Sequence, residues 1–132
     1  MRRLLLSAAV LMLAGCNPSA TGTTASETTA ATAALPENFP NADPTVRAAE
    51  CAAYLGLSIA AHATPAGRDQ PIMQQSADQW RAWLSVEDKM SDDEVNQLVA
   101  SSVNPLSPTP SATRDAASAW CVENAPEPDP QH

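Results

Sequence analysis

Residues 91–103, Ser-Asp-Asp-Glu-Val-Asn-Gln-Leu-Val-Ala-Ser-Ser-Val, decide the class of fold. Ser91 and Glu94 have the spacing of a capping box, in which each side chain bonds the backbone N–H of the other residue at a helix start. Acidic residues in this first turn also complement the positive end of the helix dipole. Apolar side chains then recur every three or four residues, and we expect the helix to end at Asn104-Pro105. This apolar face comprises Val95, Leu98, Val99 and Val103.

Three other segments, on both sides of this stretch, carry helix signals of the same kind. Asp43-Pro44 is typical of an N-cap followed by the first helical residue, because proline has a helical φ angle and no N–H to leave unpaired. A second start falls near residues 69–71, and Thr109-Pro110 opens the last segment. The expected helices therefore cover residues 43–62, 69–71 to at least 84, 91–103 and 109–124.

The connections between these segments indicate how the helices pack. They are about 4 to 8 residues long, and short connections make sequence neighbours pack together as an antiparallel bundle. No segment has the alternating β-branched pattern of a strand. The sequence therefore predicts an all-α fold, a small four-helix bundle over residues 43–124.

The N-terminus has the layout of an export signal. Arg2 and Arg3 precede an apolar run, residues 4–13, which is too short to span a bilayer as a permanent helix. The run ends in Leu13-Ala14-Gly15-Cys16. This segment resembles the signal peptides of bacterial lipoproteins, whose Leu-Ala-Gly-Cys box ends in the cysteine that is acylated. The resemblance implies a signal peptide over residues 1–15 and lipidation at Cys16, whereas the alternative is an ordinary secretory signal with a chance cysteine.

The same resemblance bears on the location of the mature protein. It implies a lipid-anchored protein of the cell envelope, and Asn17 after the cysteine favours the outer membrane over the inner membrane. Residues 16–42 are rich in Thr, Ala and Ser, and such a segment is expected to form a flexible tether because it has little apolar surface to bury. Leu35 and Phe39 are lone apolar residues near its end that we expect to dock onto the domain. Residues 125–132 form a Pro-rich, acidic tail, and we expect no packing for residues 127–132.

Cys51 and Cys121 are the two cysteines that remain once Cys16 is lipidated. Exported proteins reach oxidising compartments in which disulfides form, and two cysteines allow one intramolecular pairing. A domain of this size has a marginal core, so a bridge that closes a long loop would stabilise it substantially. We therefore expect a structural Cys51–Cys121 disulfide between the first and last helices, and not a redox-active pair, because the spacing is not Cys-x-x-Cys.

The sequence contains no recognisable catalytic, metal-binding or phosphate-binding motif. His62 is the one histidine of the helical domain, and no second histidine or cysteine stands at a metal-ligand spacing from it. There is no nucleophile elbow and no Gly-rich phosphate loop. Seven basic against fifteen acidic residues, a net charge of −8, disfavour nucleic acid as a partner. We expect no catalytic residue, no metal and no cofactor.

Trp80 and Trp83 are the candidates for recognition. They lie about one helical turn apart on the same side of the second helix. One interpretation is that both fill an alanine-rich core. The other is that one of them, Trp83, stays partly exposed and anchors a partner protein, because aromatic residues dominate interface energetics.

These features predict a membrane-anchored envelope lipoprotein with a non-enzymatic, protein-binding helical domain. Its partners would be the lipid bilayer, through acylated Cys16, and an envelope protein. A more specific alternative is an inhibitor, immunity or exclusion factor, because a small acidic domain suits the blocking of a larger basic protein. In outline the domain is also similar to small periplasmic acid-stress chaperones, which are helical and carry one disulfide. An enzyme would need a catalytic constellation that the sequence lacks.

Overall fold

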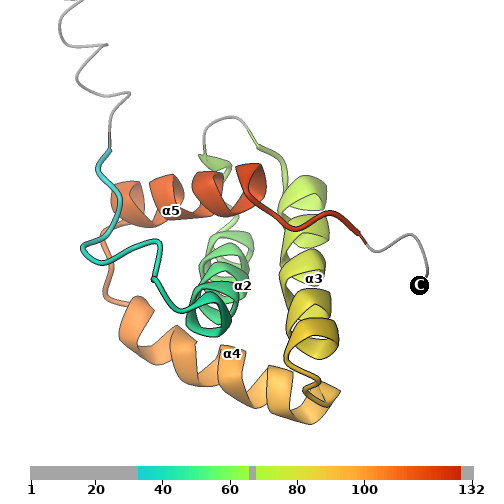
Figure 1. Ribbon diagram of the computed structural model, residues 1–132. Coiled ribbons are helices and arrows are strands. Elements are labelled where there is room, and N and C mark those ends of the chain that lie inside the picture. The colour runs from blue at the N-terminus through green and yellow to red at the C-terminus, as the bar shows by residue number, and fades with distance from the viewer. Residues whose placement is uncertain (1–32, 66–67, 129–132) are drawn as a thin grey trace, which may run out of the picture. The chain divides into compact units, whose positions relative to one another are not determined.

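The computed structural model describes residues 33–65 and 68–128. These residues form four helices and no strand (Figure 1). The all-α prediction is confirmed, and so is the single disulfide between helices. The predicted signal peptide, the lipidation site Cys16 and residues 17–32 of the tether lie outside the described residues. The helices are α2 (Pro44–Ala60), α3 (Gln70–Glu87), α4 (Asp92–Leu106) and α5 (Ser111–Glu123).

The helix starts follow from local capping residues. The Asp43 carboxylate accepts hydrogen bonds from the first backbone N–H groups of α2, and Asp69 does the same for α3. Both halves of the capping box at Ser91 and Glu94 are present at the start of α4. Each acceptor satisfies N–H groups that have no partner within the helix. The start of α5 differs, because its N-cap is Pro110 and no side chain caps it.

The expected end of α4 at Asn104-Pro105 is wrong by about one residue, because the helix continues through Pro105 to Leu106. A proline removes the backbone bond to the carbonyl four residues earlier, which strongly disfavours it in a helix interior. Pro105 stands in the last turn of α4. Helical hydrogen bonding is present after it, because the N–H of Ser107 donates to the Val103 carbonyl at 2.9 Å.

Helix α2 lies at the centre of the domain and contacts α3, α4 and α5. Its buried residues point to most sides of the helix, so a neighbour is needed on each of them. In Figure 1, α4 and α5 lie at opposite edges of the domain, with α2 and α3 between them. Consequently α4 and α5, although joined by a short connection, make few contacts with each other. The expectation that sequence neighbours pack together therefore fails at this pair.

Two buried interactions join α2 to α5. Cys51 and Cys121 form the expected disulfide, with Cα atoms 5.4 Å apart and both residues fully buried. Ser58 and Ser118, also fully buried, share a hydrogen bond of 2.8 Å between their hydroxyl groups. Ser118 additionally lies within hydrogen-bond distance of the Tyr54 carbonyl, so the buried hydroxyls are satisfied. The two helices are thus connected both covalently and by a polar contact inside the core.

Phe39 belongs to the core, as expected for an apolar residue at the end of the tether. Its ring stands edge-on to Tyr54 of α2 and to Trp120 of α5, with centroid distances of 5.3 Å in both cases. Such edge-to-face pairs are a favoured aromatic geometry. Leu35, in contrast, is exposed. The folded domain therefore begins before Asp43, the boundary expected from the sequence, because a core residue precedes it.

Candidate functional site

The two tryptophans of α3 have different environments. Trp80 is buried, with 6% of its surface exposed, and its indole Nε1–H donates to the Cys121 carbonyl at 2.9 Å. Cys121 lies in the last turn of α5, where carbonyls lack an N–H donor within the helix, so Trp80 supplies the missing donor. Trp83 is half-buried and packs only partly against the core. The interpretation of Trp80 as core is confirmed, and Trp83 remains as the candidate for recognition.

The remaining surface of Trp83 lines a groove of about 720 Å³. One wall is the outer face of α3 and the other is the segment that follows α5. The groove is lined by Pro71, Gln74, Gln75, Asp78, Gln79, Ala82, Trp83, Val86, Glu87, Pro126, Glu127 and Pro128. Val86 is 42% exposed, which is high for a large apolar side chain. The groove is thus an apolar strip on α3, bordered by polar residues.

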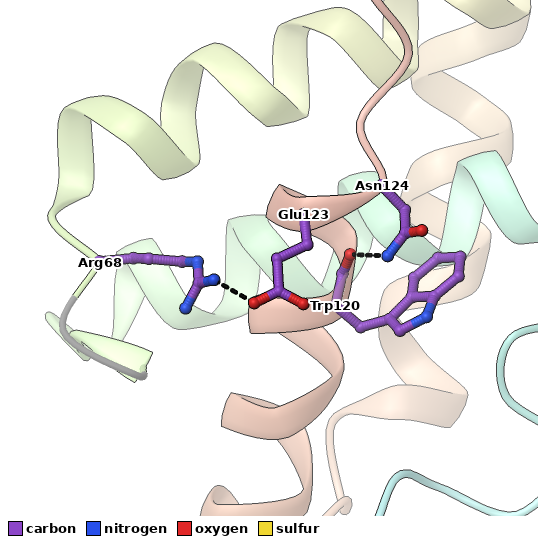
Figure 2. Close-up of polar contacts among 4 residues, drawn as sticks. All are labelled: Arg68, Trp120, Glu123 and Asn124. Carbon is purple, nitrogen blue, oxygen red and sulfur yellow. Dashed lines mark hydrogen bonds and ion pairs between the residues drawn. The ribbon is translucent and has the colours of Figure 1, made fainter.

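The first residues of the C-terminal segment have a defined position, whereas Glu127 and Pro128 are exposed. Ala125 packs against the core, and Pro126–Pro128 line the groove. The chain turns at Asn124, whose side-chain Nδ2 donates to the Trp120 carbonyl at 2.9 Å (Figure 2). In Figure 1 the segment then crosses α3. Residues 129–132 lie outside the described part of the chain.

An ion pair also links the start of α3 to the end of α5, near one end of the groove. Arg68, just before α3, forms an ion pair with Glu123 in the last turn of α5, and the two side chains point toward each other in Figure 2. Glu123 is largely exposed, and ion pairs of this kind contribute less than about 1 kcal/mol. The pair therefore helps to set the position of α3 beside α5 more than it stabilises the fold.

The charged residues that line the groove are all acidic. Three carboxylates, Asp78, Glu87 and Glu127, belong to its lining, and no lysine or arginine does. Asp78 accepts a hydrogen bond of 3.0 Å from the Gln74 side chain one turn earlier. Carboxylates on both walls of a hollow raise its negative potential above that of a flat surface with the same charges. The groove thus combines an apolar strip with an acidic border.

His62 stands apart from the groove, in the connection that follows α2. It is exposed and has a φ angle of 53°, and its backbone N–H donates to the Ile59 carbonyl at 3.0 Å. Its backbone thus helps to close the helix end, and its ring Nδ1 lies 3.2 Å from the Gln70 side-chain Nε2. Among the residues that the structure describes, no group of three or more His, Cys, Asp or Glu side chains could hold a metal ion. No helix in this part of the chain is both long and apolar enough to cross a membrane.

Within residues 33–65 and 68–128, three buried side-chain polar atoms have no hydrogen-bond partner: Glu50 Oε2, Arg114 Nε and Asp115 Oδ1. They lie on α2 and α5, away from the residues that line the groove. Burial raises the pKa of Glu50, because a low-dielectric environment disfavours the charged form. Burial also raises the pKa of the neighbouring Tyr54 hydroxyl. No local pattern indicated the burial of these groups, since α2 and α5 resemble ordinary alanine-rich helices in sequence.

The raised pKa of Glu50 makes a testable prediction for stability. Above its folded pKa the carboxylate is charged in an environment that disfavours charge, so stability falls as pH rises from the unfolded value through the folded one. Glu50→Gln should therefore raise the melting temperature at about pH 7 and lose this gain at about pH 3.5, where the glutamate is neutral in both states. Melting curves across this range, with exposed Glu37→Gln as control, check the prediction. A gain that is the same at both pH values would contradict it.

No protein-family model, curated protein or solved structure matches this chain. The function must therefore be argued from the residues of this chain. The disulfide accounts for Cys51 and Cys121 as structural residues, which leaves the groove at Trp83 as the candidate site.

Proposed function

We propose that this protein is a lipid-anchored lipoprotein of the bacterial cell envelope whose helical domain binds another protein through the groove at Trp83. The anchor is supported by the sequence Leu13-Ala14-Gly15-Cys16 after a short apolar run, and Asn17 favours the outer membrane. The partners are the lipid bilayer and an envelope protein, not a nucleic acid. The proposal assigns no catalytic step and no cofactor to the domain.

The observation that carries the proposal is the half-buried Trp83 beside exposed Val86 in a groove of about 720 Å³. Aromatic side chains that are held by the core on one side and open on the other are typical anchors of protein interfaces. Concave apolar surfaces with polar borders are also typical of binding sites. The acidic border favours, as a more specific form of this function, an inhibitor or immunity factor for a basic protein.

Cys16→Ala tests the anchor. Because the thiol is the acylation site, the variant should lose fatty-acid label and leave the membrane fraction, either uncleaved or as a soluble exported form. Metabolic labelling with a fatty acid, followed by fractionation of the envelope, measures both effects. Asn17→Asp is the matched control, since it should keep the label and shift the protein toward the inner membrane. Normal labelling of the Cys16→Ala protein would refute lipidation at Cys16.

Substitutions in the groove test the binding function. Trp83→Ala should reduce partner capture from the native envelope about tenfold, as expected for an anchor residue. It should also cost about 1–2 kcal/mol of stability, because only part of the indole is buried. Val86→Ala should reduce capture about threefold with little effect on stability.

Val46→Ala is the matched control, because Val46 is a similarly exposed valine on α2 that does not line the groove. Covalent cross-linking of the acylated protein in its envelope, followed by identification of the attached proteins, measures capture. Melting curves verify that each variant is folded at the temperature of the assay. Equal capture by wild type and the folded Trp83→Ala protein would refute the groove as the binding surface.

A further inference from the structure

We infer that the groove binds a positively charged, partly apolar segment of a partner protein. The inference rests on the proposed binding function and specifies the chemistry of the occupant. It follows from the charges of the two walls, from the apolar strip between them and from the composition of the rest of the chain.

The charges come from both walls. Asp78 and Glu87 lie on α3, nine positions apart, which corresponds to about 13 Å along a helix axis. Glu127 lies on the opposite wall. With no basic residue in the lining, these carboxylates are not neutralised within the groove. An occupant that carries lysine or arginine at intervals would meet opposite charges along the groove and on both of its sides.

The apolar strip requires apolar side chains in the occupant as well as positive charge. Ala82, Trp83 and Val86 present side chains that a purely hydrophilic cation would leave in water. Apolar side chains between the basic residues of the occupant would cover this strip. The exposed part of the indole also attracts cations through its ring face. A segment that alternates basic and apolar residues therefore fits both features, and neither a free cation nor a neutral apolar peptide does.

The chain itself does not supply such a segment. Residues 17–42 contain no lysine or arginine, so the predicted tether lacks the charge. A second copy docking through the same groove would bring its own carboxylates against Asp78, Glu87 and Glu127, which disfavours a symmetric contact. Nucleic acids and anionic lipid surfaces are disfavoured for the same reason. A basic segment of another protein is the occupant that these charges favour.

The experiment uses two short synthetic peptides that differ only in the sign of their charge. In one, lysine and leucine are spaced among serines, and in the other glutamate replaces lysine. Each labelled peptide is titrated with the acylated full-length mature protein in nanodiscs of phosphatidylcholine, and empty discs serve as the blank. Fluorescence anisotropy should show the lysine peptide binding at least about tenfold more tightly than the glutamate peptide. The preference should weaken as salt is raised from about 20 to about 300 mM.

Charge variants separate the groove from the net charge of the protein. Asp78→Asn with Glu87→Gln should weaken binding of the lysine peptide about five- to tenfold. The control, Glu37→Gln with Asp93→Asn, makes the same change in net charge at exposed positions outside the groove and should change binding less than about twofold. Trp83→Ala should weaken binding of the lysine peptide about tenfold.

Three results would overturn the inference. These are equal binding of the two peptides, an equal loss in both double variants, and a dimer of the protein alone that Trp83→Ala dissociates. Loss of these peptide preferences while envelope capture still depends on Trp83 would reject the cationic occupant and keep the binding function. Envelope capture that is insensitive to Trp83→Ala would instead reject the binding function, so the two failures are distinguishable.

Discussion

Removal of the Cys51–Cys121 disulfide should destabilise the domain by about 2–5 kcal/mol. The two residues are 70 positions apart, so the bridge closes a long loop and removes many conformations from the unfolded chain. In the chain-entropy model a loop of this length corresponds to about 4 kcal/mol. Small domains have total stabilities of only about 5–15 kcal/mol, so much of the stability of this one depends on the bridge.

The double variant Cys51→Ala with Cys121→Ala tests this prediction. Alanine is preferred to serine because both positions are fully buried and a hydroxyl there would need a partner. Equilibrium unfolding in urea measures the loss, and the melting temperature should fall by more than about 8 °C. Reductant should lower the melting temperature of wild type and leave that of the double variant unchanged. Two free thiols titrated in protein purified without reductant would contradict the prediction.

Trp80→Ala should cost about 3–5 kcal/mol, which is comparable to the loss of the disulfide. The substitution empties a buried site and also leaves the Cys121 carbonyl, in the last turn of α5, without its donor. Trp80→Phe separates these two effects. The phenyl ring keeps most of the apolar volume and has no N–H, so this variant should cost about 1–3 kcal/mol, mainly through the unpaired carbonyl.

Equilibrium unfolding of the two Trp80 variants and of Trp83→Ala measures the order of the effects. We expect Trp80→Ala to be the most destabilising of the three, because Trp83 is only half-buried. A cost of Trp83→Ala equal to that of Trp80→Ala would show that both tryptophans belong to the core. It would then remove the argument that Trp83 is free to contact a partner.

The features predicted correctly from the sequence are those that depend on a few neighbouring residues or on a unique choice. Asp43, Asp69 and Ser91 cap helices through bonds to backbone groups two or three residues away, so their pattern is local. The pairing of Cys51 with Cys121 followed from there being no other pair once Cys16 is assigned to the anchor. Local capping signals were sufficient to predict the helices, and the number of cysteines was sufficient to predict the disulfide.

The features that were missed depend on contacts between distant parts of the chain. The sequence left open whether Trp80 and Trp83 both belong to the core, because their burial depends on other helices, such as α5, whose Cys121 carbonyl accepts a hydrogen bond from Trp80. The groove has one wall on α3 and the other at Pro126–Pro128, so no local pattern could reveal it. The exposed Val86, one turn after Trp83, was a local sign of it. The few contacts between α4 and α5 likewise follow from how α2 is surrounded.

The docking of Phe39 has a mechanical consequence for a protein held at its N-terminus. Tension that reaches the domain along the preceding chain acts first on Phe39, which contacts α2 through Tyr54 and α5 through Trp120. Unwinding of α2 from its start can proceed only as far as Cys51, where the load passes through a covalent bond to Cys121. The stretch of α3 that lines the groove lies beyond this point in the chain. If the protein is anchored at its N-terminus as proposed, tension can therefore unwind the first turns of α2 before it reaches the stretch of α3 that lines the groove.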